Sequence, residues 1–172
     1  MTSQPVILDA TCACRSMWFQ KDEPHTLFVD QRELDGEKRF GSKDSLRHYH
    51  IAPDVIASFT DLPFPDNTFW HVVFDPPHLI HVSDNAWLYL KYGRLPTAWQ
   101  DVIRAGFTEC MRVLKPNGTM IFKWSDLQIS TPDVIKAIGV QPLYGHRSGK
   151  KMNTNWMAFM KFDISCVAEV TE

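Results

Sequence analysis

Short runs of β-branched and aromatic residues recur along this 172-residue chain, and the first four lead into an acidic residue. The runs are apolar throughout, which is typical of strands buried on both faces of a parallel sheet. Helical stretches alternate with them, so the sequence predicts an α/β fold with a mainly parallel sheet and helices on both faces. Such sheets bind ligands at the carboxyl ends of their strands. The runs are 6–8, 26–29, 55–59, 71–74, 119–122 and 156–160, and the acids are Asp9, Asp30, Asp61 and Asp75.

Two segments carry helical signals. Apolar residues between 95 and 114 recur at steps of three and four, and the turn residues 115–118 follow, which predicts an amphipathic helix and its end. A shorter helix is expected over 132–138, because a proline opens it. Residues 16–20 are interpreted as the remnant of a first helix. Residues 31–50 are charged and lack periodicity, so they are expected to form a loop or an irregular insertion.

The length suits a single domain spanning residues 1–172, and no repeat or linker divides the chain. Apolar residues at 44% and charged residues at 22% argue against wholesale disorder and against a disulfide scaffold. No apolar run approaches the ~20 residues of a membrane helix. The first residues carry no basic leader, so we expect a cytoplasmic protein whose four cysteines are free thiols.

The net charge of −2 hides an uneven distribution. Residues 134–162 hold five of the 18 basic residues and none of the 20 acidic ones. Such a split marks a candidate surface for an anionic ligand. The glycine-flanked segment 145–151 is therefore a candidate phosphate clamp through Arg147, Lys150 and Lys151, and a solvated basic loop is the alternative.

The sequence Asp75-Pro76-Pro77-His78 follows the fourth run and carries the strongest chemical signal. Two consecutive prolines cannot continue a sheet ladder, and they restrict where the Asp75 carboxylate and the Pro76 carbonyl point. Two neighbouring acceptors can hold both hydrogens of an exocyclic amine. The planar ring of His78 can stack on a flat substrate. The alternative is a proline turn whose aspartate caps the next helix.

This motif resembles the Asp/Asn/Ser-Pro-Pro-aromatic signature of class I S-adenosylmethionine-dependent methyltransferases that act on amino nitrogens, including those of nucleobases. Residues 61–73 and 111–119 resemble two further stretches of these enzymes, so the resemblance spans about residues 5–125. It implies a Rossmann-like methyltransferase fold. The chain is most similar to small phage and prophage methyltransferases, a minimal version that lacks an N-terminal helix.

The resemblance also implies a binding site for S-adenosylmethionine at the strand ends. Asp30 would accept hydrogen bonds from the ribose hydroxyls, Asp61 from the adenine amino group, and Leu62 would lie against the adenine ring. The loop after the first strand lacks the family's glycines, so we expect an altered backbone there. The cofactor-binding residues implied are Asp9, Ala10, Thr11, Cys12, Asp30, Asp61, Leu62 and Asp75, and the catalytic ones are Asp75, Pro76, Pro77 and His78.

The expected activity is methyl transfer to an exocyclic amine of a nucleobase in DNA or RNA, with a duplex base flipped into the site. A methyltransferase of small-molecule or protein amines is one alternative. A non-catalytic binding protein on the same fold, such as a phage inhibitor, is another. Nucleic acid is the expected partner, with no membrane and with a possible homodimer. Substrate contacts are assigned to Trp87, Tyr92, Lys123, Trp124, Arg147, Lys150 and Lys151, with core packing the alternative for the aromatic residues.

Two cysteines and two histidines, Cys12, Cys14, His48 and His50, offer zinc-ligand types. Each pair is separated by one residue, which is not the spacing of zinc sites, so no metal is expected. A nucleophilic role for Cys12 is a further alternative.

Overall fold

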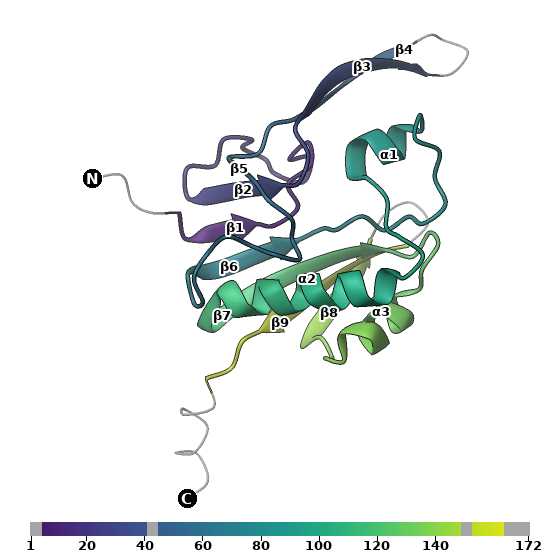
Figure 1. The fold of residues 1–172 in the computed structure, drawn as a ribbon. Coiled ribbons are helices and arrows are strands. Elements are labelled where there is room, and N and C mark those ends of the chain that lie inside the picture. Colours follow the sequence, from purple (N-terminus) through teal and green to yellow (C-terminus); the bar gives the residue numbers. More distant parts are fainter. Residues whose placement is uncertain (1–4, 41–44, 149–152, 164–172) are drawn as a thin grey trace, which may run out of the picture.

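The structure is a computed structural model, and it describes residues 5–40, 45–148 and 153–163. A seven-stranded sheet forms its centre (Figure 1). Its first five strands in space run parallel, β9 pairs antiparallel with the fifth, and β8 pairs antiparallel with β9, which confirms the predicted mainly parallel α/β fold. In spatial order the strands are β5 (Val55–Ile56), β2 (Thr26–Asp30), β1 (Ile7–Asp9), β6 (Phe69–Phe74), β7 (Leu114–Ser125), β9 (Thr154–Met160) and β8 (Tyr144–Ser148).

Both predicted helices are confirmed. The long one is α2 (Trp99–Val113), and the short one is α3 (Thr131–Ile138), where the side chain of Ser130 caps the first turn by accepting from the Asp133 amide. A further helix, α1 (Trp87–Tyr92), lies near the carboxyl ends of the strands (Figure 1). None of the helices in the described parts of the chain is long and apolar enough to cross a membrane.

The expectation of helices on both faces is wrong for the described residues. Helices α2 and α3 pack together on one face of the sheet (Figure 1). The connection between β1 and β2 forms turns where a helix remnant was expected at 16–20. The indole of Trp18 in that connection packs edge-on against Phe28 at 5.2 Å between ring centroids. A five-residue stretch cannot offset the cost of starting a helix, so these side-chain contacts decide its conformation.

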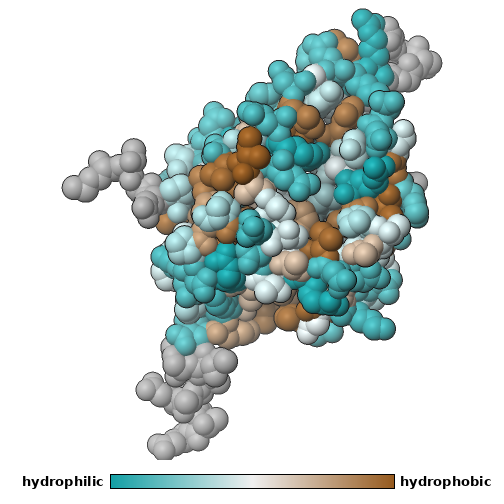
Figure 2. Space-filling model, viewed as in Figure 1, coloured by the Kyte–Doolittle hydropathy of each residue, from teal (hydrophilic) through white to brown (hydrophobic). Residues whose placement is uncertain are grey.

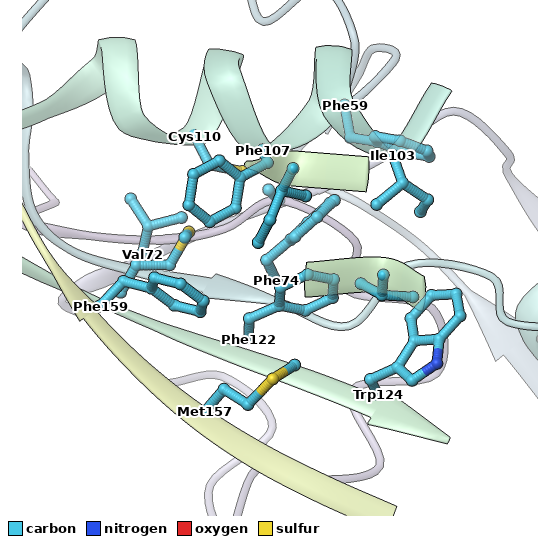
Figure 3. Close-up of a cluster of buried hydrophobic side chains, with 14 of the residues drawn as sticks. Phe59, Val72, Phe74, Ile103, Phe107, Cys110, Phe122, Trp124, Met157 and Phe159 are labelled. Carbon is cyan, nitrogen blue, oxygen red and sulfur yellow. The ribbon is translucent and has the colours of Figure 1, made fainter. Parts of the chain in front are cut away.

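The hydrophobic core lies between the sheet and α2 (Figure 3). Alternate residues of each strand point toward the helix, so the core residues follow the period of two that a strand imposes. This packing fixes the strands against one another and thereby sets where their carboxyl ends lie. The core side chains include Leu8, Val29, Val72, Phe74, Met120, Phe122, Trp124, Met157 and Phe159 from the strands and Ile103, Phe107, Cys110 and Val113 from α2.

A two-stranded antiparallel hairpin, β3 (Leu34–Phe40) and β4 (Ser45–Ile51), replaces the loop expected over 31–50. The hairpin projects away from the central sheet (Figure 1). Because neither of its faces packs on the core, its sequence lacks the alternation of apolar and polar residues that identifies a half-buried strand. The prediction of a loop was therefore wrong for a physical reason, since burial generates the pattern.

Gly106 offers a test of the packing between α2 and the sheet. A Cβ at this position would lie 2.4 Å from Cδ2 of Phe59 and 3.0 Å from Cζ of Phe74. Alanine normally stabilises a helix relative to glycine, but here it would overpack the core. We expect Gly106→Ala to lower the free energy of unfolding by about 1–3 kcal/mol in urea denaturation. The exposed control Thr108→Ala should change it by under ~0.5 kcal/mol, and equal stability of both variants would contradict the packing.

Candidate active site

Three acidic residues meet at the carboxyl end of the sheet, where β1, β2 and β6 end next to one another. They are Asp9, Asp30 and Asp75, as the sequence predicts. The backbone amide of Asp75 donates a hydrogen bond to Oγ1 of Thr11 at 2.8 Å. That bond ties the Asp75 motif to the loop that follows β1, so the two segments implied to hold cofactor and substrate share one wall.

The Asp9 carboxylate turns inward. Its Oδ2 accepts from the indole Nε1 of Trp18 at 2.6 Å, and its Oδ1 accepts from the Thr11 amide at 3.2 Å. Burial raises the pKa of Asp9 to about 7, and the charges of Asp75 and Asp30 act in the same direction. Since both oxygens bind protein groups, Asp9 organises the loop, and the structure gives it no contact with a ligand cavity.

The raised pKa of Asp9 predicts how stability depends on pH. An aspartate in the unfolded chain has a pKa of 3.8, whereas the folded protein keeps the Asp9 proton to about pH 7. Stability from this group is therefore complete below pH 3.8 and is lost as pH rises through about 7. Asp9→Asn removes this titration and keeps an acceptor for Trp18. Compared with wild type, we expect its Tm to fall less between about pH 4 and pH 8, by at least ~2 °C; parallel curves would contradict this.

The glycine-free loop after β1 has the altered backbone that the sequence predicts. Ala13 and Arg15 adopt positive φ angles of 45° and 49°, the region that normally favours glycine. The amide of Ala13 thereby points at Asp30 and donates to its Oδ2 at 3.1 Å. Cys12 is buried, and its amide donates to the carbonyl of Val29 at 2.8 Å. Burial also raises the pKa of the Cys12 thiol, which disfavours a nucleophilic thiolate and removes Cys12 from the ligand-facing residues.

Asp30 is held by Arg32, a residue that the sequence reasoning missed. Nε of Arg32 donates to Oδ1 of Asp30 at 3.0 Å, and Nη2 donates to Oδ2 at 3.1 Å. The same guanidinium reaches the carbonyls of Leu90 and Lys91 at the end of α1, at 3.4 Å each. An arginine two residues after an acidic strand end is the signal that could have indicated this ion pair.

A small cavity borders Asp30, with a volume of about 20 Å³. This space suits about one water molecule. Arg32, which holds Asp30, is one of the residues that line it, so movement of that side chain would enlarge the cavity. The other residues around it are Ala10, Thr11, Ala13, Asp30, Gln31, Phe59, Asp75, Pro77 and Tyr92.

Asp61 and Leu62 do not line this cavity. The side chain of Leu62 is 3% exposed and belongs to the hydrophobic core, whereas Asp61 points into solvent. The Leu62 amide donates to Oε2 of Glu109 at 2.9 Å, and its carbonyl accepts from Arg112 at 3.0 Å. These bonds to α2 hold Leu62 in the core. The adenine contacts implied for Asp61 and Leu62 are therefore not supported. Phe59, and neither of these two residues, borders the small cavity.

Asp75 forms an ion pair with Lys123 of β7, whose Nζ donates to Oδ2. Both side chains border a second cavity of about 260 Å³. Asp75 therefore lies between the two cavities, and so does Tyr92 at the end of α1. The predicted proximity of Lys123 to the motif is found, but the sequence did not indicate that its partner is Asp75. The second cavity is also lined by His78, Leu88, Trp124, Ser125, Leu127, Asn153 and Thr154.

The remainder of the proline motif faces inward. Pro76 is buried and Pro77 borders the small cavity. His78 is 6% exposed, and its ring lies 5.3 Å from that of Tyr92. Burial lowers the pKa of His78, while a hydrogen bond with the Pro76 backbone opposes that shift. The expected stacking of His78 on a substrate is not supported; the ring packs on Tyr92 and steadies the motif.

Trp124 belongs to the core. Its indole is fully buried, and Nε1 donates to the carbonyl of Ile129 at 3.0 Å, so the ring offers no exposed face for the expected substrate contact even though the residue borders the second cavity. Trp87 lies at the start of α1 and packs against Tyr49 of the hairpin, with 6.3 Å between ring centroids. Trp87 is not among the residues that border either cavity beside Asp75.

The basic C-terminal segment differs from the expected loop. Arg147 lies in β8, where it donates to Oδ1 of Asn155 at 3.2 Å and approaches Asp126 at 3.6 Å. Because an acid faces it, Arg147 is not the unopposed cation of a phosphate clamp. Lys150 and Lys151 lie outside the described residues.

No group of three or more histidine, cysteine or acidic residues that could hold a metal ion occurs among residues 5–40, 45–148 and 153–163. In the hairpin, Nδ1 of His48 pairs with Glu37 at 3.0 Å, and Nδ1 of His50 pairs with Asp35 at 3.4 Å.

No protein-family model matches the sequence, and no curated protein matches it. The fold is similar to that of the PH0226 protein from Pyrococcus horikoshii OT3, with a TM-score of 0.56 and 16% identity, covering 95% of this chain and 84% of that one. It is also similar to 1,6-didemethyltoxoflavin-N1-methyltransferase of Burkholderia thailandensis, solved with 1,6-didemethyltoxoflavin and S-adenosylhomocysteine. That TM-score is 0.50 at 12% identity, covering 93% and 72% of the two chains. The chain thus has a Rossmann-like methyltransferase fold.

Proposed function

We propose that the protein is an S-adenosylmethionine-dependent methyltransferase that acts on an exocyclic amino nitrogen of a nucleobase in DNA or RNA. The observation that carries the proposal is the place of Asp75, in the wall between a cavity beside Asp30 and a second cavity beside Lys123. A methyl donor on one side and an amine on the other would meet at this carboxylate. The fold of the toxoflavin N1-methyltransferase supports the same class of reaction.

The residues around the small cavity fit the chemistry of S-adenosylmethionine. Asp30 offers a carboxylate that can accept from two ribose hydroxyls, and Ala10 and Ala13 leave room for close approach of the backbone. The space of about 20 Å³ is far too small for a nucleoside. Binding therefore requires Arg32 to leave Asp30. On its far side Arg32 borders another cavity of about 200 Å³, into which the guanidinium could move.

The chain's own groups would position the substrate amine. When bound, the cofactor supplies an electrophilic methyl group. The Asp75 carboxylate, with the Pro76 carbonyl if it turns from His78, accepts hydrogen bonds from the amine and directs its lone pair toward the small cavity. Lys123 fixes the carboxylate through their ion pair. The amine nitrogen would gain the methyl group as the sulfur–methyl bond of the sulfonium breaks, with the electron pair left on sulfur, and the nitrogen would release one proton to water. Positioning of the two reactants provides most of the rate in this scheme.

Incubation with labelled S-adenosylmethionine and separate pools of DNA, RNA, protein and small amines tests the proposal. We expect label in a nucleobase amino group of DNA or RNA. Label only in a small-molecule or protein amine would replace the nucleic-acid substrate with that alternative. No label in any pool, with a cofactor that binds, would contradict the activity.

A non-catalytic binding protein on this fold is a second candidate. The observation that favours it is the Arg32–Asp30 ion pair, which fills the place where a ribose would bind. Under this alternative the pair is permanent and S-adenosylmethionine does not bind at high micromolar concentration. Measured methyl transfer would exclude it.

A further inference from the structure

The hairpin of β3 and β4 has two chemically different faces. It projects from the sheet beside α1 (Figure 1), and mostly hydrophilic side chains cover it (Figure 2). In its register Lys38 lies opposite Arg47 and Gly36 lies opposite Tyr49. Because successive residues of a strand alternate between faces, these four residues share one face.

The other face carries pairs of opposite charge. Glu37 and His48 are register partners, as are Asp35 and His50, and each pair is in contact. Arg39 on this face lies opposite Leu46. The register partners on this side thus combine an acid and a histidine, and on the other face the cations Lys38 and Arg47 are register partners. A phosphate bound between two cations in register can accept hydrogen bonds from both of them.

Aromatic rings lie next to the two cations. A Cβ at Gly36 would lie 2.4 Å from the hydroxyl oxygen of Tyr49, so the ring of Tyr49 can cross the partner strand only because that residue is glycine. The Tyr49 ring meets Trp87 of α1 edge-on, at 71° between ring planes. The guanidinium of Arg47 lies over the Trp87 ring, 5.8 Å from its centroid. Rings that alternate with cations are the means by which proteins bind a single nucleic-acid strand.

Helix α1 links this surface to the candidate active site. It starts at Trp87, ends at Tyr92, and has no buried residue. Tyr92 borders both the small cavity and the second cavity. A six-residue helix is about 9 Å long, roughly the reach of one or two nucleotides. A strand held on the hairpin can therefore extend along α1 to Asp75.

We propose that this face, defined as Lys38, Arg47, Tyr49 and Trp87 and here called the hairpin face, binds a single nucleic-acid strand. Lys38 and Arg47 contact its phosphates, and the rings of Tyr49 and Trp87 stack on its bases. The hairpin face then guides the target base into the second cavity. The inference rests on the proposed function for the methylation of that base. Binding of the strand itself can be measured without any methyl transfer.

Fluorescence anisotropy with labelled oligodeoxythymidylate of about 12 nucleotides tests the hairpin face. We expect Lys38→Gln/Arg47→Gln to weaken binding about 10- to 100-fold at low salt and to reduce the slope of log affinity against log salt by about 1–2. Arg39→Gln is the control, because it removes one positive charge from the opposite face of the same hairpin. We expect its affinity to stay within about threefold of wild type.

A second variant separates stacking from charge. We expect Trp87→Ala to weaken binding about tenfold and to leave the salt slope unchanged, because stacking releases no counterions. A reduced slope would assign Trp87 only an indirect role in placing Arg47 and would contradict the stacking. Circular dichroism of each variant verifies that the hairpin and α1 remain folded.

Three results would overturn the inference: no binding by wild type, equal losses in Arg39→Gln and the double variant, or tighter binding of a duplex of the same length. Titration of the same preparations with S-adenosylmethionine separates the two proposals. Strand binding at the hairpin face without cofactor binding would leave this interface standing and contradict the methyltransferase. Cofactor binding with an unaffected double variant would contradict the interface alone.

Discussion

Asp75→Ala is expected to reduce methyl transfer by about 1000-fold or more, while the affinity for S-adenosylmethionine stays within about threefold. The carboxylate is the group that would hold the amine, and Asp30 rather than Asp75 would bind the nucleoside. Single-turnover transfer of a labelled methyl group measures the first effect, and calorimetry measures the second. Equal loss of transfer and of cofactor affinity would remove Asp75 from its catalytic role.

A second variant controls for the ion pair that Asp75→Ala breaks. Removing the aspartate leaves the partly buried ammonium of Lys123 without this partner, which destabilises the protein. Asp75→Ala/Lys123→Met removes both charges, so we expect thermal stability to return toward that of wild type. Methyl transfer should remain absent. Recovery of transfer in the double variant would mean that the unpaired lysine, and not the missing carboxylate, had caused the loss.

Arg32→Ala is expected to raise the affinity for S-adenosylmethionine about 10- to 100-fold. In the structure the guanidinium holds both oxygens of Asp30 and walls a cavity of about 20 Å³, so binding must first break this pair. The measured affinity is reduced by the small fraction of molecules in which Arg32 has moved. Removing the side chain removes that cost, and calorimetric titration measures the gain.

The same variant should be less stable without cofactor, by about 2–4 kcal/mol, because Asp30 loses the guanidinium that compensates its charge. Arg104→Ala is the control, since Arg104 lies on α2, pairs with the exposed Asp101 and borders neither the small cavity nor the cavity on the other side of Arg32. Its cofactor affinity should equal that of wild type. A lower affinity in Arg32→Ala would show that Arg32 binds the cofactor directly and does not block its place.

The sequence predicted the strands and helices that are buried, because burial requires a recognisable pattern of apolar residues. The apolar runs located six of the seven strands of the sheet, and the period of α2 located its helix. The hairpin was missed because it buries neither face. The segment between β1 and β2 forms turns, whereas a helix remnant was expected at 16–20. The hydrogen bond between Trp18 and Asp9 contributes to this difference, because no local sequence pattern connects these two residues.

The sequence predicted the acidic residues at the strand ends, but it did not predict the ion pairs that these residues form. Asp30 and Asp75 stand where parallel strands place them, but their partners Arg32 and Lys123 depend on side-chain geometry. Leu62 was misassigned for a similar reason. Its bonds to Glu109 and Arg112 join residues nearly 50 positions apart, and they draw the side chain into the core.

Calorimetric titration with S-adenosylmethionine of wild type, Arg32→Ala and Asp30→Asn/Arg32→Ala tests the methyltransferase proposal most directly. One saturable site per chain is expected in wild type. Without Arg32 in either protein, affinity should be at least about tenfold lower in Asp30→Asn/Arg32→Ala than in Arg32→Ala, because an amide accepts poorly from two hydroxyls. No binding by wild type and by Arg32→Ala at high micromolar cofactor would contradict the proposal and leave a binding protein that uses only the fold.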